Sequence, residues 1–256
     1  MRTLGRTGIQ VSPFALGTMK FGPYGNPDPG DCVRIIHKAL DAGINVIDTA
    51  DVYGGDGETE RIVGQALRGR RDDVVLATKF NGPMGDDPNR QGNSRRWIVT
   101  AVEDSLRRLG VEYIDLYQVH HVDHRTDVEE TLAALTDLLR AGKVRAIGTS
   151  GLPAAEIVEA QWVAERRGLA RFRTEQPHYS ILNRGIERDV LPCSTMVRAM
   201  CWPRSPPSGC RSWPPGGPPS RSSAVTVMRS HLARPLRSWR AWPGGPGLGA
   251  NPCTAG

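Results

Sequence analysis

The first 192 residues alternate between short apolar runs and longer stretches in which apolar residues recur every three or four positions. Short runs of this kind are typical of buried parallel strands, and the longer stretches are typical of amphipathic helices. We predict strands at 14–16, 45–47, 73–78, 113–119, 144–148 and 172–175. Helical stripes lie at 33–40, 62–67, 98–109, 132–139 and 157–163, and the glycines that follow them are suited to helix caps: Gly43, Gly69, Gly110, Gly142 and Gly168. This alternation predicts a parallel α/β fold.

The predicted sheet resembles a barrel more than an open dinucleotide-binding sheet. No Gly-x-Gly-x-x-Gly motif follows the first strand, which argues against a Rossmann fold. We therefore predict a TIM-type (β/α)8 barrel that is incomplete, with about six strands. The segment 3–11 predicts a small hairpin before the first parallel strand. In such a barrel the carboxyl ends of the strands meet on one face, where catalytic residues lie.

The segment 193–256 has a different composition. The 256-residue chain has 33 Lys and Arg, 27 Asp and Glu and a net charge of +6, yet this segment holds eight arginines and no Asp, Glu or Lys. The remaining 25 basic and 27 acidic side chains give residues 1–192 a net charge of −2. Because the segment is rich in Pro, Gly, Ser and Arg and only 225–228 resembles a strand, we expect a disordered tail after a barrel domain of residues 1–192.

Two origins fit this tail. A mixture of Arg, Pro, Ser, Gly, Trp and Cys without acidic residues is what GC-rich DNA encodes out of frame, which suggests a frameshift near residues 190–195. The alternative is a genuine basic tail. Its arginines lack interleaved lysines and a groove-forming fold, so we predict no nucleic-acid partner.

The barrel region has the features of a protein from a reducing compartment. Its single cysteine, Cys32, excludes a disulfide framework within residues 1–192. The first residues lack a basic-then-apolar signal pattern, and no run approaches the ~18 apolar residues of a spanning helix. We predict a cytoplasmic protein without a membrane partner.

Four polar residues lie at or just after the ends of predicted strands, namely Asp48, Tyr53, Lys79 and His120. A tyrosine hydroxyl, with a pKa of about 10, donates a proton poorly at neutral pH unless a cation stabilises its phenolate. A lysine supplies that cation, an aspartate holds the lysine, and a histidine can orient a substrate carbonyl by a hydrogen bond. The set therefore predicts general acid catalysis on a carbonyl, completed by an external hydride donor.

Each residue also has a structural interpretation. Asp48 is suited to capping the following turn, and Tyr53 to a half-buried position in a loop. His120, His121 and His124 form an H-H-x-x-H pattern that suggests a metal site. Because adjacent side chains at a strand end point to opposite sides, we expect no shared metal ion.

Six motifs together resemble the aldo-keto reductase superfamily in order along residues 2–189. They are G-T-M-K-F-G, I-D-T-A-D-V-Y-G, A-T-K-F, D-L-Y-Q-V-H, I-G-T-S-G and E-Q-P-H-Y-S-I-L-N-R. The resemblance implies a β/α barrel and the NAD(P)H-dependent reduction of aldehydes and ketones, which are small-molecule carbonyl substrates.

The resemblance also implies individual roles. Tyr53 is the proton donor, Lys79 and Asp48 tune it, and His120 orients the carbonyl. The implied cofactor contacts come from Gly17, Thr18, Met19, Ser150 and Gln176.

The sequence departs from the family pattern in two places. Gly151 stands where the family usually has an asparagine. The family's last two barrel strands, with a Gly-rich loop over the pyrophosphate and a basic loop at the 2′-phosphate, have no counterpart in 193–256. We therefore expect a sheet with two unpaired edges and a chain of low stability.

The resemblance favours NADP(H) over NAD(H), although the loop that discriminates between them is missing. The sequence identifies neither the substrate nor the oligomeric state. Two alternatives stay open: a non-catalytic regulatory or binding subunit, as some relatives are for channels, and an inactive frameshifted product.

Overall fold

The computed structural model describes residues 1–196, 200–201 and 226–229. The strands are β1 (Arg2–Thr3), β2 (Gln10–Val11), β3 (Phe14–Gly17), β4 (Val46–Asp48), β5 (Val75–Phe80), β6 (Ile114–Val119), β7 (Val144–Thr149), β8 (Thr174–Glu175), β9 (Met200–Cys201) and β10 (Thr226–Arg229). The α-helices are α1 (Pro29–Asp41), α2 (Glu58–Leu67), α3 (Arg95–Leu109), α4 (Val128–Arg140), α5 (Ala154–Arg167) and α6 (Val190–Met196). Two 3-10 helices, η1 (Arg71–Asp73) and η2 (Gly185–Glu187), complete the described elements.

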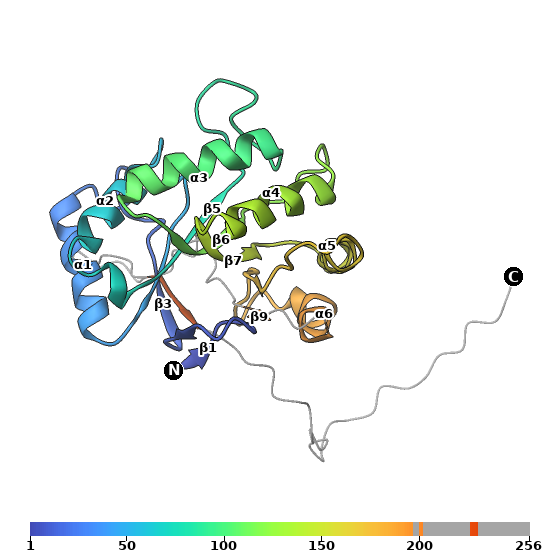
Figure 1. The fold of residues 1–256 in the computed structure, drawn as a ribbon. Coiled ribbons are helices and arrows are strands. Elements are labelled where there is room, and N and C mark those ends of the chain that lie inside the picture. The colour runs from blue at the N-terminus through green and yellow to red at the C-terminus, as the bar shows by residue number, and fades with distance from the viewer. Residues whose placement is uncertain (197–199, 202–225, 230–256) are drawn as a thin grey trace, which may run out of the picture.

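The main sheet is a curled half-barrel. Strands β3 to β8 run parallel in chain order, and helices α1 to α5 lie along its outer side (Figure 1). All six parallel strands predicted from the sequence are present, each within two residues of its predicted start and end. The α/β class and the incomplete TIM-type barrel are therefore confirmed.

Each edge of the six-stranded parallel sheet is extended by one more short strand, so that among the described residues the two unpaired edges lie at β9 and β10 and not at β8 and β3 as expected. β9 lies parallel to β8, and β10 lies antiparallel to β3, beside which it is drawn in red in Figure 1. β10 confirms the strand predicted at 225–228, shifted by one residue. The expected disorder of the tail concerns residues that lie almost entirely outside the described part, and the domain boundary at 192 stays a prediction.

The apolar core has two layers, one on each face of the sheet. The outer layer packs the sheet against the helices, with Trp97, Ile98 and Leu132 among its buried side chains. The inner layer fills the amino-terminal half of the curled sheet: Ala15, Val46, Val75, Ala77, Leu116 and Ala146. Leu4 and Val11 of the β1–β2 hairpin complete this layer. The predicted hairpin thus closes the bottom of the half-barrel and leaves its carboxyl end for polar groups.

The helices end where the glycine pattern predicts. Gly110 and Gly168 are the C-caps of α3 and α5, with φ of +64° and +65°. These left-handed conformations favour glycine. In the part of the chain that the structure describes, no helix has the length and apolar character needed to cross a membrane.

Candidate active site

Strand alternation turns a set of polar side chains into the half-barrel at its carboxyl end. Along β5, Val75 and Ala77 belong to the inner apolar layer, and Lys79 follows at the same period of two. The same period carries β4 from Val46 to Asp48. Lys79 is also the register partner of Gln118 on β6. The chain therefore places apolar residues at the bottom and charged or amide residues at the top of one interior.

Lys79 and Asp48 form a buried ion pair in this upper layer. Lys79 Nζ lies 2.7 Å from Asp48 Oδ1, and it also donates to the Thr49 carbonyl at 2.8 Å. The lysine side chain is 0% exposed and that of the aspartate 4%. Within the described residues these bonds use two of the three ammonium donors. Such a charge is stable in the interior only with compensation of this kind.

Tyr53 and His120 complete the cluster. Their ring centroids lie 5.7 Å apart in an edge-to-face arrangement, and Lys79 Nζ lies 5.3 Å from the centre of the tyrosine ring. Both aromatic side chains are buried. The Tyr53 carbonyl accepts a bond from the Thr59 amide at the start of α2, while the His120 amide donates to Phe80 O at the end of β5. The structure thus brings together all four residues that the sequence predicted as a catalytic set.

Ser150 and Gln176 are the first residues after β7 and β8, and Gln176 contacts this set. The Gln176 side chain donates to Asp48 Oδ2 at 3.3 Å and accepts from Gln118 Nε2 at 3.1 Å. Ser150 Oγ donates to the Gln176 carbonyl at 3.3 Å. The two predicted nicotinamide contacts are therefore connected to each other and, through Gln176, to Asp48.

The three other predicted cofactor residues follow the end of β3. Gly17 is the register partner of Asp48. Both the amide and the hydroxyl of Thr18 donate to the Asp48 carbonyl, at 2.9 and 3.0 Å. Met19 follows in the adjoining turn and is half-buried. The segment 17–19 therefore lies beside Asp48, where the predicted cofactor contacts need it to be.

The polar groups in this region fit a nicotinamide carboxamide. Such a group presents one carbonyl acceptor and an amide donor. Ser150 offers a hydroxyl and Gln176 an amide, and both side chains are buried. Gln118 Oε1 is a buried acceptor without a hydrogen-bond partner among the residues that the structure describes. A donor and acceptor set of this composition is what an amide-bearing ligand needs.

Sequence reasoning did not single out Gln118 or Glu175. Gln118 stands two residues before His120, so strand alternation was the signal for it. Glu175 directly precedes Gln176 and is completely buried. Burial raises the pKa of its carboxyl to about 7, against opposing hydrogen bonds from Thr149 and from backbone amides. No feature of the isolated sequence marked that burial.

A second buried carboxyl that the sequence did not identify is Asp51, between Asp48 and Tyr53 in the chain. It is 0% exposed. Burial, followed by the nearby Glu60 carboxylate, raises the pKa of Asp51 well above its usual value. The positive charges of Arg108 and Lys79 oppose that rise.

The expected arrangement of the adjacent histidines is wrong. The His120 and His121 rings do not point to opposite sides but stack, with centroids 4.4 Å apart and an interplanar angle of 8°. β6 ends at Val119, so both histidines lie beyond the strand and alternation no longer applies to them. Across the described ranges, no group of three His, Cys, Asp or Glu side chains is placed to hold a metal ion.

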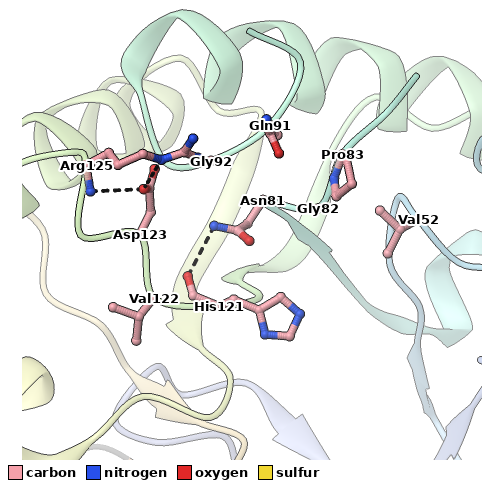
Figure 2. A pocket seen from close by; sticks show the side chains of 10 residues that line it. All are labelled: Val52, Asn81, Gly82, Pro83, Gln91, Gly92, His121, Val122, Asp123 and Arg125. Carbon is pink, nitrogen blue, oxygen red and sulfur yellow. Dashed lines mark hydrogen bonds and ion pairs between the residues drawn. The ribbon is translucent and has the colours of Figure 1, made fainter. Parts of the chain in front are cut away.

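A pocket of about 330 Å³ is lined in part by Val52 and His121, the chain neighbours of Tyr53 and His120 (Figure 2). Its lining comes from the loop between β5 and α3, from the loop after β6 and from the residue before Tyr53. The lining residues are Val52, Asn81, Gly82, Pro83, Gln91, Gly92, His121, Val122, Asp123 and Arg125. Asn81 Nδ2 donates to the His121 carbonyl at 3.2 Å, and Asp123 pairs with Arg125 at 3.1 Å. Through Val52 and His121 the pocket lies one residue along the chain from Tyr53 and from His120.

A parallel half-barrel with this polar cluster at the carboxyl ends of its strands defines a β/α-barrel protein of the kind that carries its chemistry on one face. The model of the Aldo/keto reductase family matches residues 13–199. The chain belongs to the aldo/keto reductase family.

Several curated proteins are similar to this chain. The uncharacterized oxidoreductase YrpG of Bacillus subtilis (strain 168) is 44% identical over 202 residues, which are 75% of this chain and 61% of that protein. Aldo-keto reductase YhdN of the same organism is 40% identical over 73% of this chain and 55% of its own length. Norsolorinic acid reductase A of Aspergillus parasiticus is 39% identical over 72% of this chain and 51% of its own length. The chain therefore spans between 51% and 61% of the length of these relatives.

Proposed function

We propose that this protein is an NAD(P)H-dependent oxidoreductase that reduces an aldehyde or ketone to an alcohol, with Tyr53 as the general acid. The observation that carries the proposal is the buried cluster in which the Tyr53 ring lies 5.7 Å from the His120 ring and 5.3 Å from Lys79 Nζ. Membership of the aldo/keto reductase family supports the reaction class, as do relatives named as oxidoreductases and reductases.

The reduced nicotinamide, when bound, supplies the hydride that forms the new C–H bond at the carbonyl carbon. As the carbonyl oxygen gains negative charge, the Tyr53 hydroxyl donates its proton to that oxygen, and the tyrosine is left as a phenolate. The Lys79 ammonium stabilises that negative charge, and Asp48 with the Thr49 carbonyl keeps the ammonium in place. His120 orients the carbonyl by a hydrogen bond. The product is the alcohol.

We assign the cofactor contacts to the polar residues and backbone groups that lie beside Asp48. Ser150 and Gln176 would bond the nicotinamide carboxamide, and the backbone of Gly17, Thr18 and Met19 would line its other side. We propose NADPH as the preferred donor and a cytoplasmic location. The substrate body would occupy the pocket that His121 and Val52 border, since these residues are the chain neighbours of His120 and Tyr53.

The test is NADPH-dependent turnover of a simple aromatic aldehyde. Tyr53→Phe removes only the hydroxyl and should lower kcat by about 10²- to 10⁴-fold, with the Kd for NADPH unchanged. Tyr113→Phe is the matched control, because Tyr113 lies just before β6, at the opposite end of the strand from His120, between Arg71 and Arg145. This control should keep its activity.

Two results would overturn the proposal. NADPH binding without turnover, equal in the unaltered protein and in Tyr53→Phe, would indicate a non-catalytic binding subunit. The absence of both binding and turnover would indicate an inactive product.

A further inference from the structure

Glu175 connects the two segments that carry the proposed nicotinamide contacts. It lies on β8 as the register partner of Thr149 on β7. Thr149 Oγ1 donates to Glu175 Oε2 at 2.5 Å, and the Gly151 amide donates to Glu175 Oε1 at 2.6 Å. Each carboxylate oxygen thus holds one side of the turn at 149–151.

This turn carries Ser150, and Glu175 itself precedes Gln176. The Gln176 amide donates to the Thr149 carbonyl at 2.9 Å, and Ser150 Oγ donates to the Gln176 carbonyl at 3.3 Å. Gly151 has a φ of +73°, a backbone conformation that glycine adopts more readily than other residues. The hydrogen bond from its amide to Glu175 holds the turn in this conformation. A movement of the Glu175 carboxylate would therefore displace Ser150 and Gln176 together.

We propose that Glu175 is a positioning residue that holds the Ser150 turn and Gln176 in the arrangement that receives the nicotinamide carboxamide. This inference rests on the proposed function. Glu175 acts through its neighbours: both of its carboxylate oxygens are bonded to Thr149 and Gly151, and the proposed contacts to the carboxamide are made by Ser150 and Gln176. Its role is to make the cofactor site rigid before the ligand arrives, which lowers the ordering cost of binding.

The strength of the two hydrogen bonds that Glu175 accepts, from Thr149 and from the Gly151 amide, depends on the protonation of its carboxyl. Burial raises the pKa of the carboxyl to about 7, and the groups that face it are Thr149 on β7 and the amides of Gly151 and Leu152 before α5. None of these groups titrates, and no described charged side chain is among the causes of the shift. The charged carboxylate accepts both bonds, and charge-assisted bonds are roughly twice as strong as neutral ones.

Protonation changes the bonding in a defined way. The neutral acid has one O–H group, which donates to Thr149 Oγ1. The Thr149 hydroxyl then donates to the Thr174 carbonyl, which lies 3.3 Å away. The Gly151 amide keeps only a neutral acceptor. NADPH affinity should therefore rise as the pH increases through about 7.

The experiment compares NADPH binding by the full chain with binding by Glu175→Ala and Glu175→Gln. Loss of both bonds in Glu175→Ala should raise the Kd and the KM for NADPH by about tenfold or more, with a smaller change in kcat at saturation. Glutamine reproduces the neutral acid, so Glu175→Gln should bind NADPH within about threefold of the unaltered chain at pH 6. It should also lose the change in affinity near pH 7.

Glu60→Gln is the matched control. Glu60 is also a completely buried glutamate that accepts a threonine hydroxyl, from Thr78 at 2.6 Å, but it lies on α2 and pairs with Arg108. This substitution should lower folding stability and leave the Kd for NADPH and its pH profile unchanged. A buried glutamate with a merely structural role would behave in the same way at position 175.

A readout without cofactor is the amide proton shift of Gly151, which should titrate near pH 7 in the unaltered chain and not in Glu175→Gln. Unchanged NADPH affinity in Glu175→Ala would overturn the positioning role alone. If that variant does not fold, an inflection near pH 7 that persists in Glu175→Gln would overturn it instead. Absence of NADPH binding by the unaltered chain would overturn the proposed function and this inference with it.

Discussion

Lys79 Nζ lies 2.7 Å from Asp48 Oδ1 in an interior where neither side chain is more than 4% exposed. Burying two charges carries a desolvation cost that only close pairing and further hydrogen bonds offset. Here the Thr49 carbonyl and the Gln176 amide provide those bonds. The pair is therefore a folding constraint as well as the proposed electrostatic support of Tyr53, and both properties can be measured separately.

Breaking the pair should destabilise the protein strongly. Asp48→Asn or Lys79→Met leaves one buried charge without its partner, so each should lower the free energy of unfolding by about 3–5 kcal/mol. The double variant removes both charges and should cost less than the sum of the two single changes. Urea unfolding followed by circular dichroism measures all four free energies.

An exposed pair provides the control for this cycle. Arg167 Nε lies 2.8 Å from Glu129 Oε2, with side chains 61% and 48% exposed. Arg167→Met should change the free energy of unfolding by less than about 1 kcal/mol. Additive effects at positions 48 and 79 would contradict the tight coupling that the short buried contact implies.

The sequence predicted most of what depends on periodicity. Period-two strands and period-3.6 helices placed Asp48 and Lys79 at neighbouring strand ends, and the structure has them in contact. The burial of Glu175 depends on packing between β7, β8 and the following loop, which no local pattern records. The pairing of β9 with β8 and of β10 with β3 is similarly non-local. β9 has only two residues, too few for a pattern, and the strand-like run at 225–228 did not indicate its partner strand.

The histidine pair marks another limit of sequence reasoning. Alternation predicts side-chain direction only while the chain stays in the strand, and His120 is the first residue after β6. Beyond that point the loop geometry decides, and it stacks the His121 ring on His120. Local pattern therefore predicted the positions of Asp48 and Lys79 at their strand ends and not the direction of the His121 ring.

Asp51 should make folding stability depend on pH. Its raised folded-state pKa means that the folded protein holds a proton that the unfolded chain has lost. The stability it contributes is present below the unfolded pKa of about 3.9 and is lost as the pH rises toward the folded value, at about 1.4 kcal/mol per pH unit. Asp51→Asn should make the slope shallower by this amount in urea unfolding measured from pH 4 upward, while the raised pKa of Glu175 leaves a slope of its own up to about pH 7.

An exposed carboxylate serves as the comparison for Asp51. Asp72 lies in η1 with its side chain in solvent, and Asp72→Asn should leave the slope unchanged. Parallel pH profiles of the unaltered chain and Asp51→Asn would refute a protonated Asp51.

Alanine substitutions at two glycines in the loop after β5 distinguish the effect of backbone strain from the effect of a change in pocket shape. Gly92 has a φ of +83°, and an added Cβ would lie 2.5 Å from Asp123 Oδ2 in the pocket wall. Gly85 has a φ of +91° with no atom within 4 Å of an added Cβ. Gly92→Ala should raise the KM for the carbonyl substrate by about tenfold, because Asp123 must move, whereas Gly85→Ala should show only the backbone cost of about 1–2 kcal/mol in stability. Equal KM values for the two variants would argue against this pocket as the substrate site.

Gly151→Asn should add a contact to the proposed carboxamide site, at a position where the family usually has an asparagine. The backbone there has a φ of +73°, which asparagine tolerates better than other side chains, and nothing lies within 4 Å of an added Cβ. The new amide should bond the nicotinamide carboxamide and tighten NADPH binding by about two- to tenfold. Gly151→Ala introduces the same backbone strain without the amide, so it should bind NADPH no more tightly than the unaltered chain. Fluorescence titration with NADPH distinguishes the two, and equal Kd values for the asparagine and alanine variants would place the carboxamide away from residue 151.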